Sequence, residues 1–377
     1  MDKETLFIQA AHARDKNTFM IALSEGFDED YFSIVLRYNG GIDQPWSRYE
    51  LNMNIASLKN YDRPDDPGFV LLSEEGDVTF IRKSGKMIET ITGAGLHNED
   101  ATGLGYTTNI EEIDGALLIG GMSAQLYQYT QDGWHWFNKP KRPLPSPTYS
   151  RIDFGRFAGT SLNDLYAATS EEPIDEIRDK TPEEREAFSQ AAAKSDIEAM
   201  KRINRKVEGE IRKRKERLHH WNGEEWREVA VPPPSKYDPS PAPIYGLLVE
   251  DTNKVWAVGH NGTILFGNAR DGFANVSPPG QSYSLKCPVL FQDQLMMIAG
   301  NMLCTFDDHQ LKPLKPKIDP NINRGVPRPL KIQVVDDVLM YFDKSHGVST
   351  WDGETWQQIP IPPELLELEF KGLKPKN

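Results

Sequence analysis

The sequence predicts an all-β protein, a seven-bladed β-propeller with a helical-hairpin insertion. Three observations support this fold: a hairpin motif that recurs along the chain, strand-like runs separated by proline-rich crossings, and one charged helical stretch that interrupts the pattern. A single blade cannot bury both of its faces, so a propeller sequence repeats the blade until the ring closes. With 377 residues and a hydrophobic share of 38%, the chain is long enough to bury such a core.

The hairpin motif is clearest in WDGETWQQIPIPP at 351–363 and in WNGEEWREVAVPPP at 221–234. Related versions are TQDGWHWFNKP at 130–140 and RYNGGIDQPWSRYEL at 37–51. Each contains Asn-Gly or Asp-Gly followed by a tryptophan. These dipeptides favour a type I′ turn, in which both central residues need a positive φ. The tryptophan is then expected on the returning strand, where its ring covers a neighbouring sheet.

The spacing of the motif predicts the number of blades. Its glycines lie at positions 40, 133, 223 and 353, so the gaps are 93, 90 and 130 residues. With about 45 residues per four-stranded blade, these gaps correspond to two blades, one blade plus an insertion of similar length, and three blades. Strand-like runs recur at 17–40, 69–83, 115–137, 164–170, 254–268, 294–308 and 337–356. We therefore predict seven blades, with six or eight as the alternatives.

Two of these segments carry a resemblance to a known group. KVWAVGHNGTILFGN at 254–268 and the closing WDGETWQQIPIPP resemble bacterial β-propellers with the loose pattern D-x-W-A-V-G-x-x-G-x-I followed by W-D-G-x-x-W. Photosystem assembly factors and sialidase-like repeat proteins belong to that company. The resemblance implies the fold and leaves the activity open, because propellers host many functions. A sialidase Asp box is not matched, since Asp352 directly precedes Gly353, and Trp351-Asp352 does not end a blade as in WD40 proteins.

Residues 171–217 form the predicted insertion within a single propeller domain. Residues 1–170 are expected to hold the blades up to the middle of blade 4, and 218–377 the remainder. Thr181-Pro182-Glu183-Glu184 is a capping box with proline at the first helical position, and Ser195 with Glu198 is a second one. We therefore predict helices over 182–193 and 196–216.

An apolar stripe follows the second predicted helix at three- and four-residue steps: Ile197, Met200, Ile203, Val207 and Ile211. This stripe is expected to pack on the propeller, on the first helix, or against a partner.

The charges are segregated along the chain. The formal net charge is -13, whereas Lys201–Arg217 contains nine Lys/Arg and three Glu, a net +6, which leaves -19 for the rest. Such acidity favours a basic protein partner and argues against nucleic acid and anionic membranes. The insertion is expected between the second and third strands of a blade, on the face that also holds the blade-to-blade crossings. Acidic residues of the same loops and of neighbouring crossings are predicted to form one rim there, with a solvated surface as the alternative.

The predicted partner-binding residues fall into two groups. The acidic rim comprises Asp28, Glu29, Asp30, Asp65, Asp66, Glu74 and Glu75. The basic helical lobe beside it contributes Arg202, Arg205, Lys206 and Arg212.

Catalytic signals are absent from the sequence. It contains no H-E-x-x-H, G-x-S-x-G, phosphate-binding loop or dinucleotide fingerprint. Adjacent His219 and His220 would point to opposite faces of a strand, which rules out a shared metal. Cys287 and Cys304 match no disulfide framework or metal spacing. We expect no enzyme activity, cofactor or metal, and a cytoplasmic chain without signal peptide or transmembrane helix that is a monomer outside its complex.

Three functions are compatible with these features. The first is a non-catalytic, protein-binding propeller, most specifically an immunity-type inhibitor of a basic bacterial toxin or effector, by analogy with other acidic inhibitors. The second is an assembly or scaffolding factor, as in the propellers that the chain resembles. The third is a glycan-binding or glycan-processing propeller, which would need exposed rings from Trp46, Trp134, Trp226 or Trp356 as stacking platforms.

Overall fold

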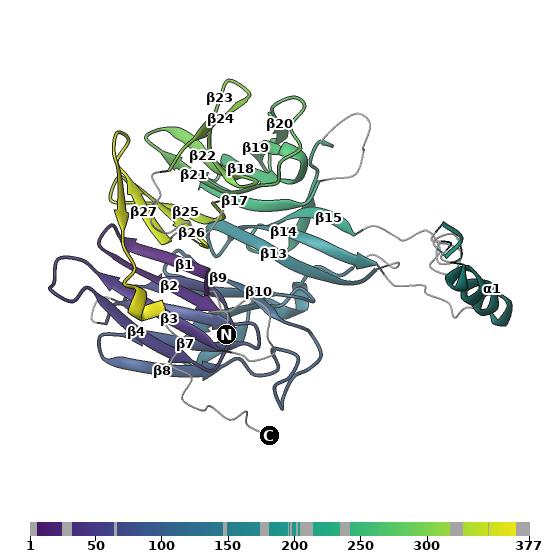
Figure 1. Cartoon of the computed structure of the whole chain (residues 1–377), viewed down its shortest axis with the longest axis horizontal. Helices are drawn as coiled ribbons and strands as arrows, with labels where there is room; N and C mark the ends of the chain where they lie inside the picture. The colour runs from purple at the N-terminus through teal and green to yellow at the C-terminus, as the bar shows by residue number, and fades with distance from the viewer. Residues whose placement is uncertain are drawn as a thin grey trace.

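A computed structural model describes residues 6–24, 32–63, 66–145, 149–173, 181–194, 196, 198–200, 203, 214–233, 242–316, 327–345 and 347–366. These residues form seven separate four-stranded antiparallel sheets, each built from strands that are consecutive in the chain. The sheets are arranged around a common axis as the blades of a propeller (Figure 1). The predicted seven-bladed β-propeller is therefore confirmed.

In every blade the strand that comes first in the chain is the innermost one. The strands of blades 1 to 3 are β1 (Phe7–Asp15), β2 (Thr18–Ser24), β3 (Ser33–Asn39), β4 (Trp46–Leu51); β5 (Ile55–Tyr61), β6 (Gly68–Ser73), β7 (Asp77–Arg82), β8 (Gly85–Thr90); β9 (Thr107–Ile113), β10 (Ala116–Gly121), β11 (Leu126–Thr130), β12 (Gly133–Trp136). Those of blades 4 and 5 are β13 (Tyr149–Ser161), β14 (Asp164–Pro173), β15 (Lys215–Trp221), β16 (Trp226–Val229); β17 (Ile244–Asp251), β18 (Lys254–Gly259), β19 (Ile264–Asn268), β20 (Gly272–Asn275). Those of blades 6 and 7 are β21 (Leu285–Phe291), β22 (Gln294–Ala299), β23 (Met302–Asp307), β24 (Gln310–Leu314); β25 (Pro329–Val335), β26 (Val338–Asp343), β27 (Gly347–Trp351), β28 (Trp356–Ile359).

The hydrophobic core lies between the blades. It divides into seven clusters, and each cluster joins the side chains of two neighbouring blades. The second strands are almost continuously apolar, as in FVLL of β6 and MMIA of β22, because both of their faces are covered by adjacent blades. The neighbouring strands alternate more between buried and exposed residues. The strand-like runs of the sequence therefore correspond mainly to the second and third strands of each blade.

The ring closes where blade 7 meets blade 1. TLFIQAA at 5–11 supplies the start of β1, the innermost strand of blade 1, and not an outer strand of the last blade. The amide of Ile8 donates to the carbonyl of Lys344 over 3.0 Å. Gln333 of β25 accepts from the amide of Ala13 at 3.0 Å and donates to its carbonyl at 2.7 Å. Closure therefore depends on side-by-side contact of two complete blades, since none of the sheets formed by the described residues contains strands from both ends of the chain.

The recurring tryptophans lie where the motif predicts, on the fourth strand of a blade. Trp351 and Trp356 face each other across β27 and β28 with ring centroids 5.7 Å apart, and Trp221 and Trp226 do the same in blade 4 at 5.8 Å. The aromatic pair covers the outer part of the blade, so the motif recurs for a structural reason.

The predicted type I′ turns at these motifs are wrong. In the turn after Trp351, only Gly353 has a positive φ, while Asp352 does not. The Asp352 carboxylate instead accepts the amides of Glu354 at 2.9 Å and Thr355 at 2.7 Å, which closes a four-residue loop. Two-residue turns with both central φ values positive occur elsewhere, for example at Asp114-Gly115 and Asp336-Asp337.

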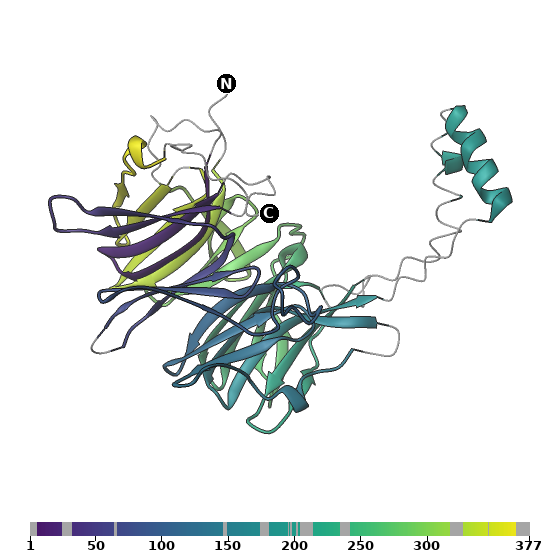
Figure 2. The same ribbon diagram turned by 90° about the horizontal axis from the view of Figure 1, so that it is seen from below.

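The insertion connects β14 and β15, the second and third strands of blade 4, as expected. Its predicted bounds of 171–217 are too wide, because 171–173 belong to β14 and 215–217 to β15, so the second helix does not extend to 216. Helix α1 (Pro182–Ala193) carries the predicted capping box, with the Thr181 hydroxyl accepting from the Glu184 amide and the Glu184 carboxylate accepting from the Thr181 amide. The helix stands away from the ring in both views (Figures 1 and 2). Of the predicted second helix, the structure describes only 196, 198–200, 203 and the residues from 214 onward; Ile197, Val207 and Ile211 of the apolar stripe lie outside the described part.

Candidate functional site

The propeller presents two faces of different composition. One face, here called the turn face, contains the turns between first and second strands and between third and fourth strands of every blade. The other, here called the insertion face, contains the loops between second and third strands, the blade-to-blade crossings and the insertion. In blade 2, for example, Tyr61 pairs with Gly68 at the turn face and Ile55 pairs with Ser73 at the insertion face.

An aspartate occurs in or beside the innermost turn of every blade. The described members, in blade order, are Asp15, Asp62 and Asp66, Asp114, Asp164, Asp251, Asp293, and Asp336 and Asp337. Because the innermost turns surround the axis of the ring, these side chains form a circle of carboxylates on the turn face. We call this set the aspartate circle.

Part of this pattern has a local structural cause. Aspartate tolerates the left-handed conformation, and Asp114, Asp293, Asp336 and Asp337 all have positive φ values between 48° and 61°. Others are held by hydrogen bonds: Asp15 accepts the amide of Asn17 at 2.9 Å. The turn chemistry explains why short polar residues occur here, but glycine or asparagine would satisfy it without charge.

The outer turns add to the negative charge of this face. The turns between third and fourth strands contain or adjoin Asp43, Asp132, Glu224, Glu225, Asp271, Asp307, Asp308, Asp352 and Glu354. Backbone hydrogen bonds, first that from the Thr355 amide, lower the pKa of Asp352 to about 2. The Arg270 guanidinium similarly lowers the pKa of Asp271 to about 2. The carboxylates of Asp271 and Asp352 are therefore ionised over the whole physiological pH range.

The predicted acidic rim is not continuous. Asp66 lies in the innermost turn of blade 2, on the turn face, where the Ser84 hydroxyl donates to its carboxylate and lowers its pKa. Glu74 and Glu75 lie at the opposite end of the same blade, between β6 and β7. Residues 62–67 connect a first strand to a second strand, whereas they were expected to form a blade-to-blade crossing. The expected arc is therefore divided between two faces.

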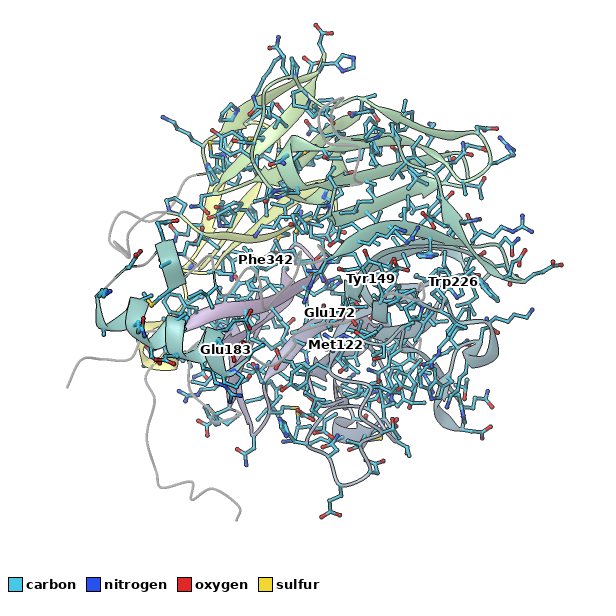
Figure 3. The ribbon with its side chains drawn as sticks, turned by 90° about the vertical axis from the view of Figure 1, so that its right-hand side faces the viewer. Met122, Tyr149, Glu172, Glu183, Trp226 and Phe342 are labelled. Atoms are coloured by element: carbon cyan, nitrogen blue, oxygen red, sulfur yellow. The ribbon has the colours of Figure 1, made fainter. Side chains whose placement is uncertain are left out.

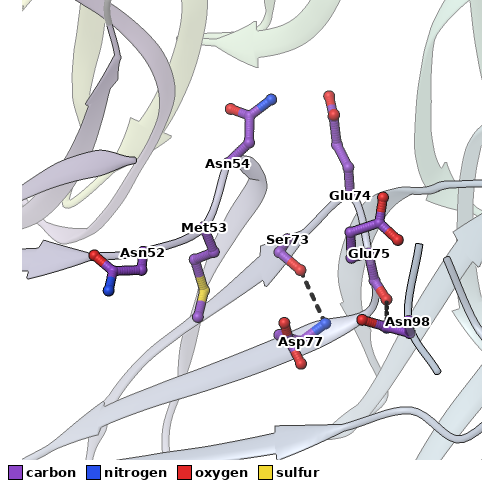
Figure 4. Close-up of a pocket in the computed structure, with 8 residues that line it drawn as sticks. All are labelled: Asn52, Met53, Asn54, Ser73, Glu74, Glu75, Asp77 and Asn98. Carbon is purple, nitrogen blue, oxygen red and sulfur yellow. Dashed lines mark hydrogen bonds between the residues drawn. The ribbon is translucent and has the colours of Figure 1, made fainter. Parts of the chain in front are cut away.

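Glu75 has a structural contact that explains its presence. One of its carboxylate oxygens accepts the amides of Leu96 at 2.8 Å and His97 at 2.9 Å, and Asn98 donates to its carbonyl at 2.6 Å. Glu75 thereby anchors the crossing from blade 2 to blade 3. Beside it, Asn52, Asn54, Glu74 and Asn98 line a small open pocket with a volume of about 70 Å³ (Figure 4).

The remaining predicted partner-binding residues lie outside the described part of the chain. These are Asp28, Glu29, Asp30, Asp65, Arg202, Arg205, Lys206 and Arg212. The described base of the insertion pairs opposite charges: Arg214 contacts Glu172 at 2.7 Å, and Arg217 contacts both Glu171 and Glu228. Figure 3 labels Glu172 at the ring and Glu183 on α1.

The four motif tryptophans are partly covered by neighbouring aromatic rings. Trp46, Trp134, Trp226 and Trp356 are half-buried, and each packs against an aromatic neighbour within its own blade. In the part of the chain that the structure describes, no three His, Cys, Asp or Glu side chains are placed to hold a metal ion. No helix there is long and apolar enough to span a membrane.

Comparisons with known proteins support the fold. No family model and no curated protein matches the sequence. A catalytically inactive variant of virginiamycin B lyase from Staphylococcus aureus with quinupristin is 12% identical over 93% of this chain and 96% of its own, with a TM-score of 0.55. The WD40 propeller domain of Doa1 is 8% identical over 95% of both chains, with a TM-score of 0.54. YCF48 from Cyanidioschyzon merolae is 10% identical over 92% of this chain and 95% of its own, also at 0.54. At such identities the similarity shows a β-propeller repeat protein and leaves the activity open.

Proposed function

We propose that this propeller is a non-catalytic binding protein that presents its acidic turn face to a basic protein partner. The observation that carries the proposal is the aspartate circle, which repeats in all seven blades although the turns themselves do not require charge. Asp62, Asp114, Asp251, Asp293, Asp336 and Asp337 are exposed. An array of this kind produces a directed field at one end of the molecule.

The energy of such an interface is distributed over many weak pairs. Each exposed ion pair contributes at most about 1 kcal/mol, so no single substitution should abolish binding. Complementary charge acts mainly on encounter, because it steers a basic partner toward the face before contact is made. Association should therefore slow as the salt concentration rises to the physiological value, where the Debye length is about 8 Å. Dissociation should change less.

In its most specific form the proposal is an immunity-type inhibitor of a basic toxin or effector. The acidic face suits a basic catalytic domain, whose active site the propeller would cover. An assembly factor would use the same face without inactivating its partner. A solved structure has YCF48, a propeller of similar fold, bound to D1 peptide, which supports peptide or protein binding as one use of this architecture.

The test begins with affinity purification from the native host and identification of the partner by mass spectrometry. Association and dissociation rates of the purified pair are then measured by surface plasmon resonance over a range of salt concentrations. The turn-face variant combines Asp114→Asn, Asp251→Asn, Asp293→Asn and Asp337→Asn. Asparagine tolerates the positive φ at three of these sites, so the turns are preserved while four charges are removed.

We expect the turn-face variant to associate at least tenfold more slowly at low salt, with a smaller change in dissociation. A matched control removes four charges from the insertion side, by Glu74→Gln, Glu99→Gln, Glu183→Gln and Glu186→Gln, and should associate like the wild type. A third variant, with Arg202, Arg205, Lys206 and Arg212 changed to Glu, tests the lobe. An unchanged association rate in the turn-face variant would overturn the proposal. Loss of the partner's own activity in the complex separates an inhibitor from an assembly factor.

A further inference from the structure

A second group of charged side chains surrounds the axis of the ring. Each member comes from the innermost strand of a different blade, and together they are called the axial cluster: His12 of β1, Lys59 of β5, Glu111 of β9, Arg156 of β13, Lys286 of β21 and Lys331 of β25. Water reaches this cluster, since Arg156 is exposed and the Lys59 and Glu111 side chains retain 20% and 28% of their exposure.

Contacts across blades hold one side of the cluster. The Lys331 ammonium donates to the carbonyl of Ala11 at 2.9 Å and lies 2.9 Å from Nδ1 of His12. Nε2 of His12 is 2.7 Å from the Asn60 amide oxygen. Burial and the charge of Lys331 keep the pKa of His12 well below its usual value, so the imidazole is neutral at pH 7 and accepts from Lys331.

The cations of the cluster outnumber its carboxylates. Lys59 forms an ion pair with Glu111. Lys286 donates to the carbonyl of Pro329 at 3.0 Å, and Arg156 donates to the carbonyl of Gly155 at 3.0 Å. Among the described residues, neither of these two side chains nor Lys331 is within ion-pair distance of a carboxylate.

Arg156, Lys286 and Lys331 lie at similar heights on the innermost strands of blades 4, 6 and 7, each four or five residues before the end of its strand. Burial, then the charge of Lys59 and less strongly that of Arg156, lowers the pKa of Lys331 to about 7, while the Glu111 carboxylate opposes part of this shift. Burial, then the charge of Lys344 and that of Arg156, lowers the pKa of Lys286. Lys286 and Lys331 are the second and third residues of their strands, so this group lies toward the insertion face and away from the aspartate circle.

We propose that Arg156, Lys286 and Lys331 bind a small multivalent oxyanion of the phosphate or dicarboxylate class on the axis of the propeller. The cations of the cluster outnumber its one carboxylate, that of Glu111, which is unfavourable, and an anion between them would reduce that cost. The guanidinium of Arg156 matches two oxygens of a phosphate or carboxylate, and the two ammonium groups act as point charges beside it. The anion would enter from the insertion face, because the turn face repels it.

The test is isothermal titration calorimetry of the full chain with inorganic phosphate and, separately, with malonate and succinate. The wild type should bind one equivalent of at least one class, and the tighter class identifies the ligand chemistry. Binding of malonate or succinate, which are fully ionised at pH 7.5, should also take up protons, because the anion favours the charged form of Lys331. The measured heat should therefore depend on the ionisation enthalpy of the buffer.

The paired variant Arg156→Gln with Lys286→Gln should weaken binding at least tenfold while its melting temperature stays near that of the wild type. Arg156→Lys keeps the charge and should retain most of the binding. A matched control, Lys254→Gln with Arg270→Gln, removes two cations from the turn face and should bind as the wild type does. Absence of saturable binding by all three anions, or equal weakening in the control pair, would overturn the site. Neither result bears on the turn-face proposal, which uses different residues and a protein ligand.

Discussion

At the scale of single residues, His219 shows how burial couples the fold to pH. It lies on β15 at the base of the insertion, is 6% exposed, and has Nδ1 3.0 Å from the Thr169 hydroxyl. Burial lowers its pKa to about 4, against about 6.5 in an unfolded chain. Between these values the unfolded state binds the extra proton. The stability linked to His219 is thus complete above pH 6.5 and is lost as the pH falls toward 4.

We therefore predict that the free energy of unfolding decreases from pH 7 to pH 5 and that His219 contributes about 2 kcal/mol of this loss. His219→Asn should reduce the pH dependence by that amount, as measured by urea unfolding at both pH values. The buried His12 acts in the same direction, so some dependence remains. His135→Asn, at an exposed position of β12, is the control and should leave the dependence unchanged. An equal slope in His219→Asn and wild type would contradict the assignment.

Glu75 illustrates at the same scale why charge alone does not identify a binding residue. Its carboxylate accepts hydrogen bonds from two backbone amides of the crossing after blade 2, at 2.8 and 2.9 Å. Asp293 has the same formal charge and is exposed in a turn, and its side chain accepts no hydrogen bond from the residues that the structure describes. Only the second kind of carboxylate keeps its charge available for a partner.

At the scale of secondary-structure elements, the insertion is separable from the blade that carries it. β14 and β15 pair continuously from Leu165 with Trp221 to Glu171 with Lys215. The sheet is complete without α1, because pairing already ends at the point where the insertion begins. Within α1, the one buried side chain among the described residues is Ala191, so the helix adds little to the core.

Replacing residues 174–213 with a short Gly/Ser bridge should therefore leave the ring folded. We expect a circular dichroism spectrum dominated by strand and a melting temperature within a few degrees of wild type. The ion pair of Arg214 with Glu172 is retained in this variant, and pairs of this kind contribute at most about 1 kcal/mol. A chain that fails to fold would show that the lobe belongs to the core.

At the scale of the whole molecule, stability depends on closing the ring. The seam between blades 7 and 1 combines an apolar cluster, which includes Phe19 and Phe342, with the bonds of Gln333 to both backbone groups of Ala13. Contacts at this seam join residues that are 320 positions apart. These are contacts of very large sequence separation, so the entropy of loop closure opposes the closing of the ring.

Gln333→Ala should consequently destabilise the ring by about 1–3 kcal/mol, because it leaves a backbone donor and acceptor of Ala13 without partners. Urea unfolding measures the loss, and the transition should remain a single one, since every blade depends on its neighbours. Gln357→Ala, at an exposed position on β28, is the matched control and should change the free energy of unfolding by less than about 0.5 kcal/mol. Equal effects of the two substitutions would show that the seam is not stabilised by Gln333.

The charge distribution is also a property of the whole molecule. The sequence predicts the acidic rim beside the basic insertion, whereas the structure places Asp66 on the turn face and leaves Glu74 and Glu75 on the insertion face. The turn face and the axial cluster thus have opposite charge within one protein. Each would select a different ligand, a basic protein on the turn face and a small anion from the insertion face.

The sequence by itself determined the propeller fold, the seven blades, the insertion point and the capping box, because these depend on local signals. The alternation within a strand, the Asx-Gly turn and the capping box of Thr181 and Glu184 each involve only a few neighbouring residues. The strand and turn signals recur along the chain. Tertiary structure alone decided which loops share a face. Residues 62–67 connect two strands of one blade, and not two blades, because β5 is the innermost strand of blade 2. Asp66 therefore lies on the opposite face of the ring from Glu74. It also decided the axial cluster, since Arg156, Lys286 and Lys331 approach one another only when the ring closes.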